Sequence, residues 1–276
     1  MRHFVWSVDP VLLRLGGVEI RYYGVLLVTA IGVGFGIWYR RARAHGEDRG
    51  FAEAWLWWSA PAVLIGGRLG EFLFYRTRDF FSDPWNSLRT AAGFSSHGVT
   101  AALLITSWAF SRRYKRSLRL VSDYCAPGLA VGTCCIRLGN FFNSEIVGQP
   151  TDVRWAVVFS RVDLVPRHPV QFYEIGAALV ALAAIRIAER RDRRVVGTGL
   201  SIGLFLGTYF CLRFIAEFFK ERMTEQLRDS GGPLAALERI LGVTLTTGQW
   251  LSIVPAIVGI VMIIGGTRRL AAMAPG

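Results

Sequence analysis

The chain has 276 residues, of which 52% are hydrophobic and only 19% are charged, and its mean hydropathy is +0.36. Soluble domains carry roughly 25% charged residues, so this composition excludes an ordinary soluble protein and indicates an integral membrane protein. The formal net charge is +12. The basic residues cluster in short loops between apolar runs. This pattern is typical of membrane proteins whose basic loops face the anionic lipids of one leaflet. We therefore expect contact with membrane lipid and no nucleic-acid partner.

Seven charge-poor runs follow one another along the chain, and each approaches the roughly 20 residues that cross a bilayer as a helix. The third and fifth runs are short. We find no internal repeat and no linker that separates a second domain, so residues 1–276 are expected to form one all-α polytopic membrane domain. The seven expected spans cover residues 22–39, 54–74, 97–111, 120–139, 171–188, 197–218 and 249–266.

The basic loops all follow odd-numbered spans. They read RRARAHGEDR (40–49), SRRYKRSLR (111–119) and RIAERRDRR (186–194), and the last span is followed by Arg268 and Arg269. The positive-inside rule makes this side cytoplasmic. We therefore expect seven transmembrane helices with the N-terminus outside and the C-terminus in the cytoplasm.

Three longer segments fall on the outer side and are expected to form a small extramembrane elaboration. Segment 140–170 contains the strand-like WAVVFS, and the polar segment 219–248 is expected to form a short helix around Pro233–Leu241. The remaining outward segment covers residues 75–96.

The cysteines and acidic residues do not suggest a metal site. All four cysteines fall in apolar segments without metal-type spacing, so buried free thiols are expected. The acidic groups are too scattered to indicate a metal, and we expect no cofactor. The cysteines are Cys125, Cys134, Cys135 and Cys211.

The stretch RLGNFFNSEIVG (137–148) is the most informative part of the chain. It places a guanidinium (Arg137), two carboxamides (Asn140 and Asn143) and a carboxylate (Glu145) directly after a charge-free run. A fixed charge at or inside a membrane boundary is unfavourable, so such groups are functional-site candidates. The amides add donors and acceptors for an anionic, hydroxyl-bearing group such as a phospholipid headgroup.

Three arginines interrupt apolar spans, namely Arg68, Arg137 and Arg213. Each one alone could be a side chain that extends toward the interface from near a helix end. Together they lie toward the outer ends of spans two, four and six, at a similar depth. Arginine binds phosphate bidentately and keeps its charge when buried, so the three residues indicate an anion-binding site.

Span six places Tyr209, Arg213 and Glu217 at spacings of four residues, so the three side chains should stack on one helical face. One interpretation is a structural Arg–Glu pair with a tyrosine beside it. The other is a polar stripe that faces a cavity, in which Glu217 orients Arg213. In span two, Arg68 and Glu71 are expected to pair in the same way.

His97 opens span three in the sequence GFSSHGVTAALL. It can be a helix cap or an interface anchor, but histidine is also the side chain best suited to accept a proton near neutral pH. His168 also lies outside, ahead of Gln171, Tyr173 and Glu174 at the start of span five. Tyr22 and Tyr23 open span one; interface tyrosines are usually belt residues, so these are weak indications.

Seven motifs in chain order resemble those of the prolipoprotein diacylglyceryl transferase family, the bacterial inner-membrane enzymes that start lipoprotein maturation. The resemblance covers nearly the full length. The motifs are RYYG (21–24), GGRLGEFLFY (66–75), SSHGV (95–99), IRLGNFFNSEIVG (136–148), RHPVQFYE (167–174), YFCLRFIAEFF (209–219) and TTGQWLSI (246–253).

The resemblance implies a multi-pass protein of the bacterial inner membrane with its active site toward the periplasm. The implied reaction moves the diacylglyceryl group of phosphatidylglycerol onto the lipobox cysteine of preprolipoprotein signal peptides, forming a thioether and releasing glycerol phosphate. Arg137 and Arg213 would hold the phosphate, and His97 would be the base, with Tyr23 or Glu145 as rivals. Phosphatidylglycerol would be bound by Arg68, Arg137, Asn140, Asn143, Glu145, Gly148, Tyr209, Arg213 and Glu217.

Several positions depart from the family pattern. Ile136 replaces the opening glycine of the signature, Val99 replaces the second glycine after His97, and TAAG (90–93) replaces a tryptophan–acidic–glycine–glycine stretch. These departures leave room for a divergent or inactive copy that acts as a phospholipid-binding or transporter-like membrane protein. Against a transporter, the chain has no repeated half. A different lipid-headgroup enzyme that uses the same anion site is a third alternative.

Overall fold

The computed structural model describes residues 3–74, 82–83, 85, 95–221 and 245–273, and these residues are predominantly helical. Seven long helices lie in this part of the chain, and each one corresponds to one expected span. They are α1 (Tyr22–Ala44), α2 (Arg49–Phe74), α5 (Ser96–Arg113), α6 (Leu118–Asn143), α7 (Val170–Arg191), α8 (Leu200–Ala216) and α11 (Thr247–Ala272).

Among the described residues, four helices are long and apolar enough to cross a membrane. These segments are Tyr22–Ala44, Val170–Arg191, Leu200–Phe219 and Gly248–Ala272. They confirm the membrane character of the chain. The full count of seven spans and the orientation of the termini stay predictions.

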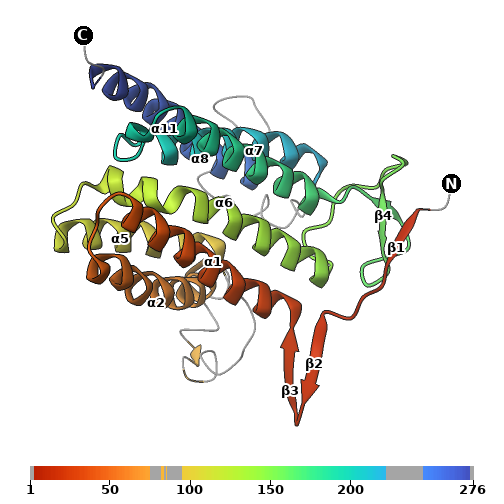
Figure 1. The fold of residues 1–276 in the computed structure, drawn as a ribbon. Coiled ribbons are helices and arrows are strands. Elements are labelled where there is room, and N and C mark those ends of the chain that lie inside the picture. The colour runs from red at the N-terminus through yellow and green to blue at the C-terminus, as the bar shows by residue number, and fades with distance from the viewer. Residues whose placement is uncertain (1–2, 75–81, 84, 86–94, 222–244, 274–276) are drawn as a thin grey trace.

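Helix α6 lies at the centre of the bundle (Figure 1). Helices α1, α2 and α5 pack to one side of it, and α7, α8 and α11 pack to the other. Small residues allow close helix contacts, as is common between membrane helices. A Cβ on Gly203 of α8, for example, would lie 2.9 Å from the backbone nitrogen of Ile263 in α11.

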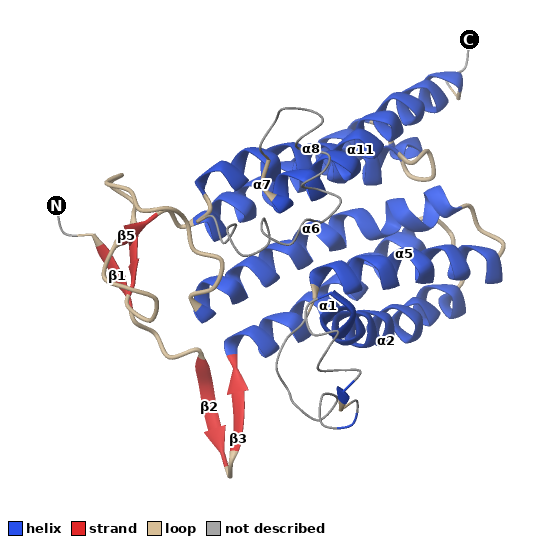
Figure 2. Cartoon of the chain, turned by 180° about the vertical axis from the view of Figure 1, so that it is seen from behind, coloured by secondary structure: helices blue, strands red, loops and turns tan. Residues whose placement is uncertain are grey.

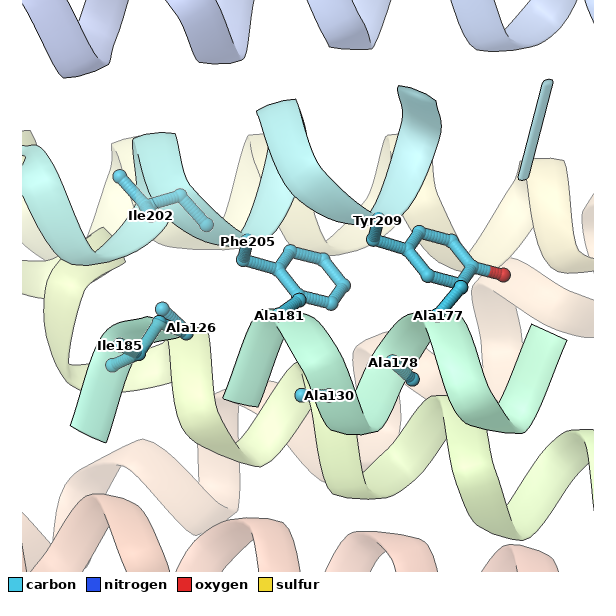
Figure 3. Close-up of a cluster of buried hydrophobic side chains, with 9 residues drawn as sticks. All are labelled: Ala126, Ala130, Ala177, Ala178, Ala181, Ile185, Ile202, Phe205 and Tyr209. Carbon is cyan, nitrogen blue, oxygen red and sulfur yellow. The ribbon is translucent and has the colours of Figure 1, made fainter. Parts of the chain in front are cut away.

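A hydrophobic cluster joins α6, α7 and α8 (Figure 3). Alanines of α6 and α7 face the aromatic rings of Phe205 and Tyr209, which stack with their centroids 5.5 Å apart. The small alanine side chains let the three helices approach and leave room for the two rings. Tyr209 thereby lies at the boundary between this core and the polar groups near the end of α8.

The three basic loops and the Arg268–Arg269 pair lie together at the end of the bundle opposite Tyr209. Contacts between these segments show that they share this end. Arg41 is buried and donates to both carboxylate oxygens of Glu189, at 2.6 and 2.7 Å, and the Glu189 side chain is 13% exposed. Further contacts at this end join Arg116 to Glu47 (2.9 Å), Arg269 to the Thr198 carbonyl (2.9 Å) and Arg194 to the Met273 carbonyl (2.6 Å).

Asp123 fixes the start of α8 at this same end. Its fully buried carboxylate accepts hydrogen bonds from the backbone N–H groups of Gly197, Gly199 and Ile202, at 2.8, 2.8 and 3.0 Å. The first N–H groups of a helix lack partners within the helix, and a carboxylate there satisfies them. Helix α8 therefore begins beside α6.

The structure contains strands that were not expected from the sequence. The strand expected in WAVVFS is confirmed as β4 (Val157–Phe159), and it pairs in parallel with β1 (Phe4–Trp6) and antiparallel with β5 (Pro166–Arg167). A hairpin of β2 (Val11–Leu15) and β3 (Val18–Arg21) precedes α1. The domain is therefore not purely helical.

Two expected outward segments are largely outside the described residues. They include the short helix around Pro233–Leu241 and most of 75–96. The third segment, 140–170, begins differently from the expectation, because α6 continues through Asn143 and holds Asn140 and Asn143 in its last turn.

Candidate functional site

A buried carboxylate, Glu174, is the centre of the site. It is 0% exposed and is positioned by the second turn of α7. Its oxygens lie 2.7 Å from Arg137 Nε, 3.1 Å from Arg213 Nη1 and 2.7 Å from Lys220 Nζ. The hydroxyl of Tyr209 also donates to it at 2.9 Å. A carboxylate buried this deeply is tolerated only when it is paired, and here three cations pair with it.

Glu174 is part of a larger network of charges. Lys220 also contacts Glu217 at 2.7 Å, so three cations and two carboxylates are directly paired, and a third carboxylate, Glu145, is linked to Arg137 through Asn140. The Arg137 and Arg213 side chains are 12% and 17% exposed. The Nε of Arg213 is buried and has no hydrogen-bond partner within the described part of the chain. Guanidinium groups with an unused donor suit a bound anion.

The end of α6 folds back to join Arg137 to two amides and a carboxylate. Ser144, with φ of 56°, ends the helix in the left-handed conformation, so Glu145 turns back toward the last helical turn. Arg137 donates to Asn140 at 3.1 Å. Asn140 and Asn143 each donate to one oxygen of Glu145, also at 3.1 Å. The four predicted residues of this stretch therefore form one hydrogen-bonded group.

Gly148 joins three backbone segments beside this group. Its N–H donates to the His168 carbonyl at 3.1 Å, and its own carbonyl accepts from Arg167 at 3.1 Å. A Cβ at this position would lie 2.8 Å from the Phe219 carbonyl oxygen. The backbone at Gly148 thus packs closely against the protein's own backbone and pairs with Lys220, which helps to hold Lys220 near Glu174. Contact of Gly148 with substrate stays a prediction.

Glu217 does not pair with Arg213 as the helical spacing suggested. Helix α8 ends at Ala216, and Glu217 opens the 3₁₀ helix η2 (Glu217–Phe219), which changes the direction of its side chain. Glu217 contacts Lys220, and Arg213 contacts Glu174 instead. The carboxylate that orients Arg213 therefore comes from α7, and the pairing expected within span six is corrected.

Tyr23 lies close to this group of residues. It stands in the first turn of α1, and a Cβ on Gly139 of α6 would lie 2.8 Å from its ring, so the tyrosine packs closely against α6 near Arg137. Arg68 lies on α2, with its guanidinium carbon 4.8 Å from the centre of the Phe72 ring. His97 is in the first turn of α5, but its side chain lies outside the described part. Contact of His97 and Arg68 with the Glu174 group stays a prediction.

The sequence reading did not include Glu174 and Lys220 among its site residues. Glu174 could have been recognised from sequence, because it is a carboxylate near the outer end of span five, at the depth of the three arginines. Lys220 follows span six directly. Its role depends on the η2 turn, which brings it between Glu217 and Glu174.

His168 forms a second polar group beside the site. Its Nδ1 lies 2.9 Å from the Tyr173 hydroxyl, which also accepts a hydrogen bond from Trp155 Nε1 at 2.8 Å. The ring of Phe219 covers His168 with a centroid distance of 5.1 Å. Burial lowers the pKa of His168 below its ordinary value, so the ring favours the neutral form.

These features define a class of protein. A helix bundle with membrane-spanning helices carries, at one end, fixed cations around a buried carboxylate, and this arrangement suits an anionic group at a membrane boundary. At the end that holds the basic clusters, buried Arg41 is paired with Glu189.

Comparison with known proteins identifies the family. The family model described as prolipoprotein diacylglyceryl transferase matches residues 10–265. The chain is 35% identical to the phosphatidylglycerol–prolipoprotein diacylglyceryl transferase of Tolumonas auensis over 268 residues, which cover 96% of this chain and 98% of that protein. It is 33% identical to the protein of that name from Bacteroides fragilis, with 92% of each chain covered. The protein of that name from Chloroherpeton thalassium is 32% identical, with 97% of this chain and 96% of that protein covered.

The chain therefore belongs to the prolipoprotein diacylglyceryl transferase family, and it is a transferase. The resemblance seen in the seven sequence motifs is confirmed.

Proposed function

We propose that this protein transfers the diacylglyceryl group of phosphatidylglycerol to the lipobox cysteine of preprolipoproteins. The observation that carries the proposal is the convergence of Arg137, Arg213 and Lys220 on Glu174 at one end of the bundle. The chain also belongs to a family whose similar members carry the name of this activity. Phosphatidylglycerol has a negative charge on its phosphodiester, which arginine side chains can bind bidentately.

The bond changes explain why arginines are needed. The cysteine sulfur attacks the glycerol carbon that carries the phosphate, so a carbon–sulfur bond forms and the carbon–oxygen bond breaks. Glycerol phosphate leaves with the bonding electron pair, and the charge on its phosphate grows during this step. Arg137 and Arg213 therefore bind the transition state more strongly than the substrate, which is the condition for lowering the barrier.

The thiol proton must move to a base. An unperturbed cysteine has a pKa near 8.5 and is nucleophilic only as the thiolate. His97 is our candidate for the base, with Tyr23 and Glu145 as alternatives. Asn140 and Asn143 contact the glycerol hydroxyls of the headgroup. In support of this role, Oδ1 of Asn143 is buried and has no hydrogen-bond partner among the described residues.

The same proposal includes the placement of the protein in the bacterial inner membrane. All seven long helices cross it, with the N-terminus and the Glu174 group on the periplasmic side. Two observations support this orientation. The three basic loops and the Arg268–Arg269 pair are joined at one end of the bundle, and the Glu174 group lies at the other. Basic loops favour the cytoplasmic side. Lipid and signal peptide then reach the site from the membrane and the periplasm.

The test uses purified protein with phosphatidylglycerol and a lipobox peptide, and it measures both glycerol phosphate release and the mass gain of the peptide. Arg137→Lys keeps the charge but loses the fork that binds two phosphate oxygens. Loss of one such transition-state donor reduces turnover by about 10²–10³-fold. Arg14→Lys, on an exposed hairpin, is the matched control and should leave the rate unchanged.

Three outcomes would count against the proposal. Near-wild-type turnover of Arg137→Lys would remove the role of Arg137 at the leaving phosphate. Release of glycerol phosphate without peptide would indicate a hydrolase. Absence of release from the wild-type protein, with or without peptide, would indicate a protein that binds phospholipid without transferring it.

A further inference from the structure

The β2–β3 hairpin projects from the bundle at the end that carries the site. β3 ends at Arg21, and α1 begins at the next residue, Tyr22, whose ring stacks on Phe142 of α6 at 4.2 Å. Figures 1 and 2 show the hairpin extending sideways from this point, crosswise to the helices. Five residues of β2 in extended conformation reach about 17 Å. Because α1 is long and apolar enough to span a membrane, the hairpin runs along the membrane face rather than through it.

The strand register gives the hairpin one apolar face. Residues paired directly across two antiparallel strands share a face, and alternate residues along a strand share it too. Leu13 pairs with Ile20 and Leu15 pairs with Val18, so these four aliphatic side chains lie on one face. Gly16 and Gly17, with φ of +51° and +88°, form the tight turn that keeps the two strands in this register.

The opposite face carries Arg14, Glu19 and Arg21 together with Val11, and its charges are matched. Arg14 pairs across the strands with Glu19 and also contacts Asp9 at 2.8 Å. Arg21 contacts Glu19 at 2.9 Å. Two arginines face two carboxylates, so the hairpin has no surplus charge with which to attract an acidic or a basic partner.

The apolar face is not covered by the described part of the protein. Leu13, Leu15 and Val18 are 47%, 55% and 64% exposed. The hairpin continues directly into α1, whose Val25 and Val28 are also exposed, as expected for side chains that face lipid. The exposed apolar surface is therefore continuous with that of a candidate membrane span.

We propose that the β2–β3 hairpin is an interfacial membrane anchor. Its apolar face, formed by Leu13, Leu15, Val18 and Ile20, inserts among the lipids at the Glu174 end of the bundle, while Arg14 and Glu19 face water. Amphipathic elements bind a membrane surface in this way through buried apolar area. The inference rests on the membrane character of the bundle and not on the transfer reaction, so it stands or fails separately from the proposed activity.

The experiment compares single cysteines on the two faces of the hairpin. Leu15→Cys and Glu19→Cys are placed in nanodiscs of uncharged phosphatidylcholine that hold one copy of the protein, and each reacts with a membrane-impermeant maleimide. The wild-type protein, with its four native cysteines, measures the background. Protein packing alone predicts faster labelling at position 15, because Leu15 is 55% exposed and the Glu19 side chain is 43% exposed.

Lipid insertion reverses that order. Lipid around the thiol excludes the reagent and raises the thiol pKa. Each unit of increase in the pKa lowers the reactive thiolate fraction by about tenfold. Leu15→Cys should therefore react at least ~10-fold more slowly than Glu19→Cys. Val18→Cys should behave like Leu15→Cys. All three variants must elute with the wild-type protein and label completely in denaturant.

Equal rates, or faster labelling of Leu15→Cys, would overturn the proposal. Protection of Leu15→Cys that appears only in nanodiscs with two copies would also overturn it, because the face would then be a contact between proteins.

Discussion

Replacement of Glu174 by glutamine tests whether this carboxylate holds the site together. The substitution keeps the shape of the side chain and removes its charge. Arg137, Arg213 and Lys220 then lose the one buried carboxylate that all three contact, at 2.7, 3.1 and 2.7 Å. Because Glu174 is fully buried, water cannot replace it at this position without rearrangement of the helices.

The expected loss of stability follows from the burial of the ion pairs that Glu174 forms. Removing one partner of a buried ion pair destabilises a protein by about 3–5 kcal/mol, since the other partner stays buried without compensation. In a chain of this size, each kcal/mol shifts the melting temperature by about 2–4 °C. Glu174→Gln should therefore lower the melting temperature of the purified protein by roughly 6–20 °C.

The assay is thermal unfolding in detergent with and without phosphatidylglycerol. The variant has one negative charge fewer at the site than the wild-type protein, so the anionic lipid should stabilise it more strongly. Glu145→Gln is the control, because this carboxylate is exposed and bonds to neutral amides, and its melting temperature should change little. A Glu174→Gln melting temperature equal to that of the wild type would refute the reasoning.

Three further predictions concern the base and the loop beside the site. His97→Gln should slow transfer at about pH 6 and recover toward pH 9, where the thiol of pKa near 8.5 ionises unaided; wild-type rates at both pH values would exclude His97 as the base. Gly148→Ala should destabilise the protein by about 1–3 kcal/mol through overpacking, whereas Gly32→Ala, with open space around its Cβ position, should not; equal chemical or thermal stability of the two variants would contradict this. Burial lowers the pKa of His168, so the unfolded chain binds the proton more readily. Stability should then rise with pH up to about 6.5 and fall below it. His168→Gln should flatten this dependence in melting curves, and an unchanged slope would count against the assignment.

The helices of this protein could be predicted from sequence because charge-poor runs of the right length alternate with charged loops. The structure extends most of these runs by a few residues. In α1, for example, the helix continues through Arg41 and Arg43 to Ala44. Arginine is a good helix former, and its long side chain lets the charged group leave the apolar zone while the backbone stays helical.

The partners within the site were harder to predict. Glu174 and Arg213 are 39 positions apart on different helices, and sequence does not give the rotation of α7 against α8. Helical spacing correctly placed Tyr209 and Arg213 on one face, since both contact Glu174. It failed at Glu217 because the backbone leaves the α-helical geometry after Ala216.

The N-terminal strands escaped prediction for two different reasons. β1 pairs with β4 about 150 residues away, and local patterns carry no information about such a pairing. The β2–β3 hairpin does have a signal, the Gly16–Gly17 turn between two β-prone runs. A register shift between Val11 and Leu13 interrupts the alternation of apolar and polar residues. The sequence of β2 therefore lacks the regular period of two that predicts a strand.

The end of the bundle that holds the basic loops has a consequence for ion permeability. There the rings of Trp38 and Trp55 stack at 4.5 Å, Tyr124 packs edge-on against Trp38, and the buried Arg41–Glu189 pair lies alongside. A bacterium stores energy as a membrane potential, worth about 2.3 kcal/mol per elementary charge at 100 mV. In the proposed orientation, this packed end would face the cytoplasm, and its stacked rings would oppose the passage of ions behind a headgroup bound at the other end.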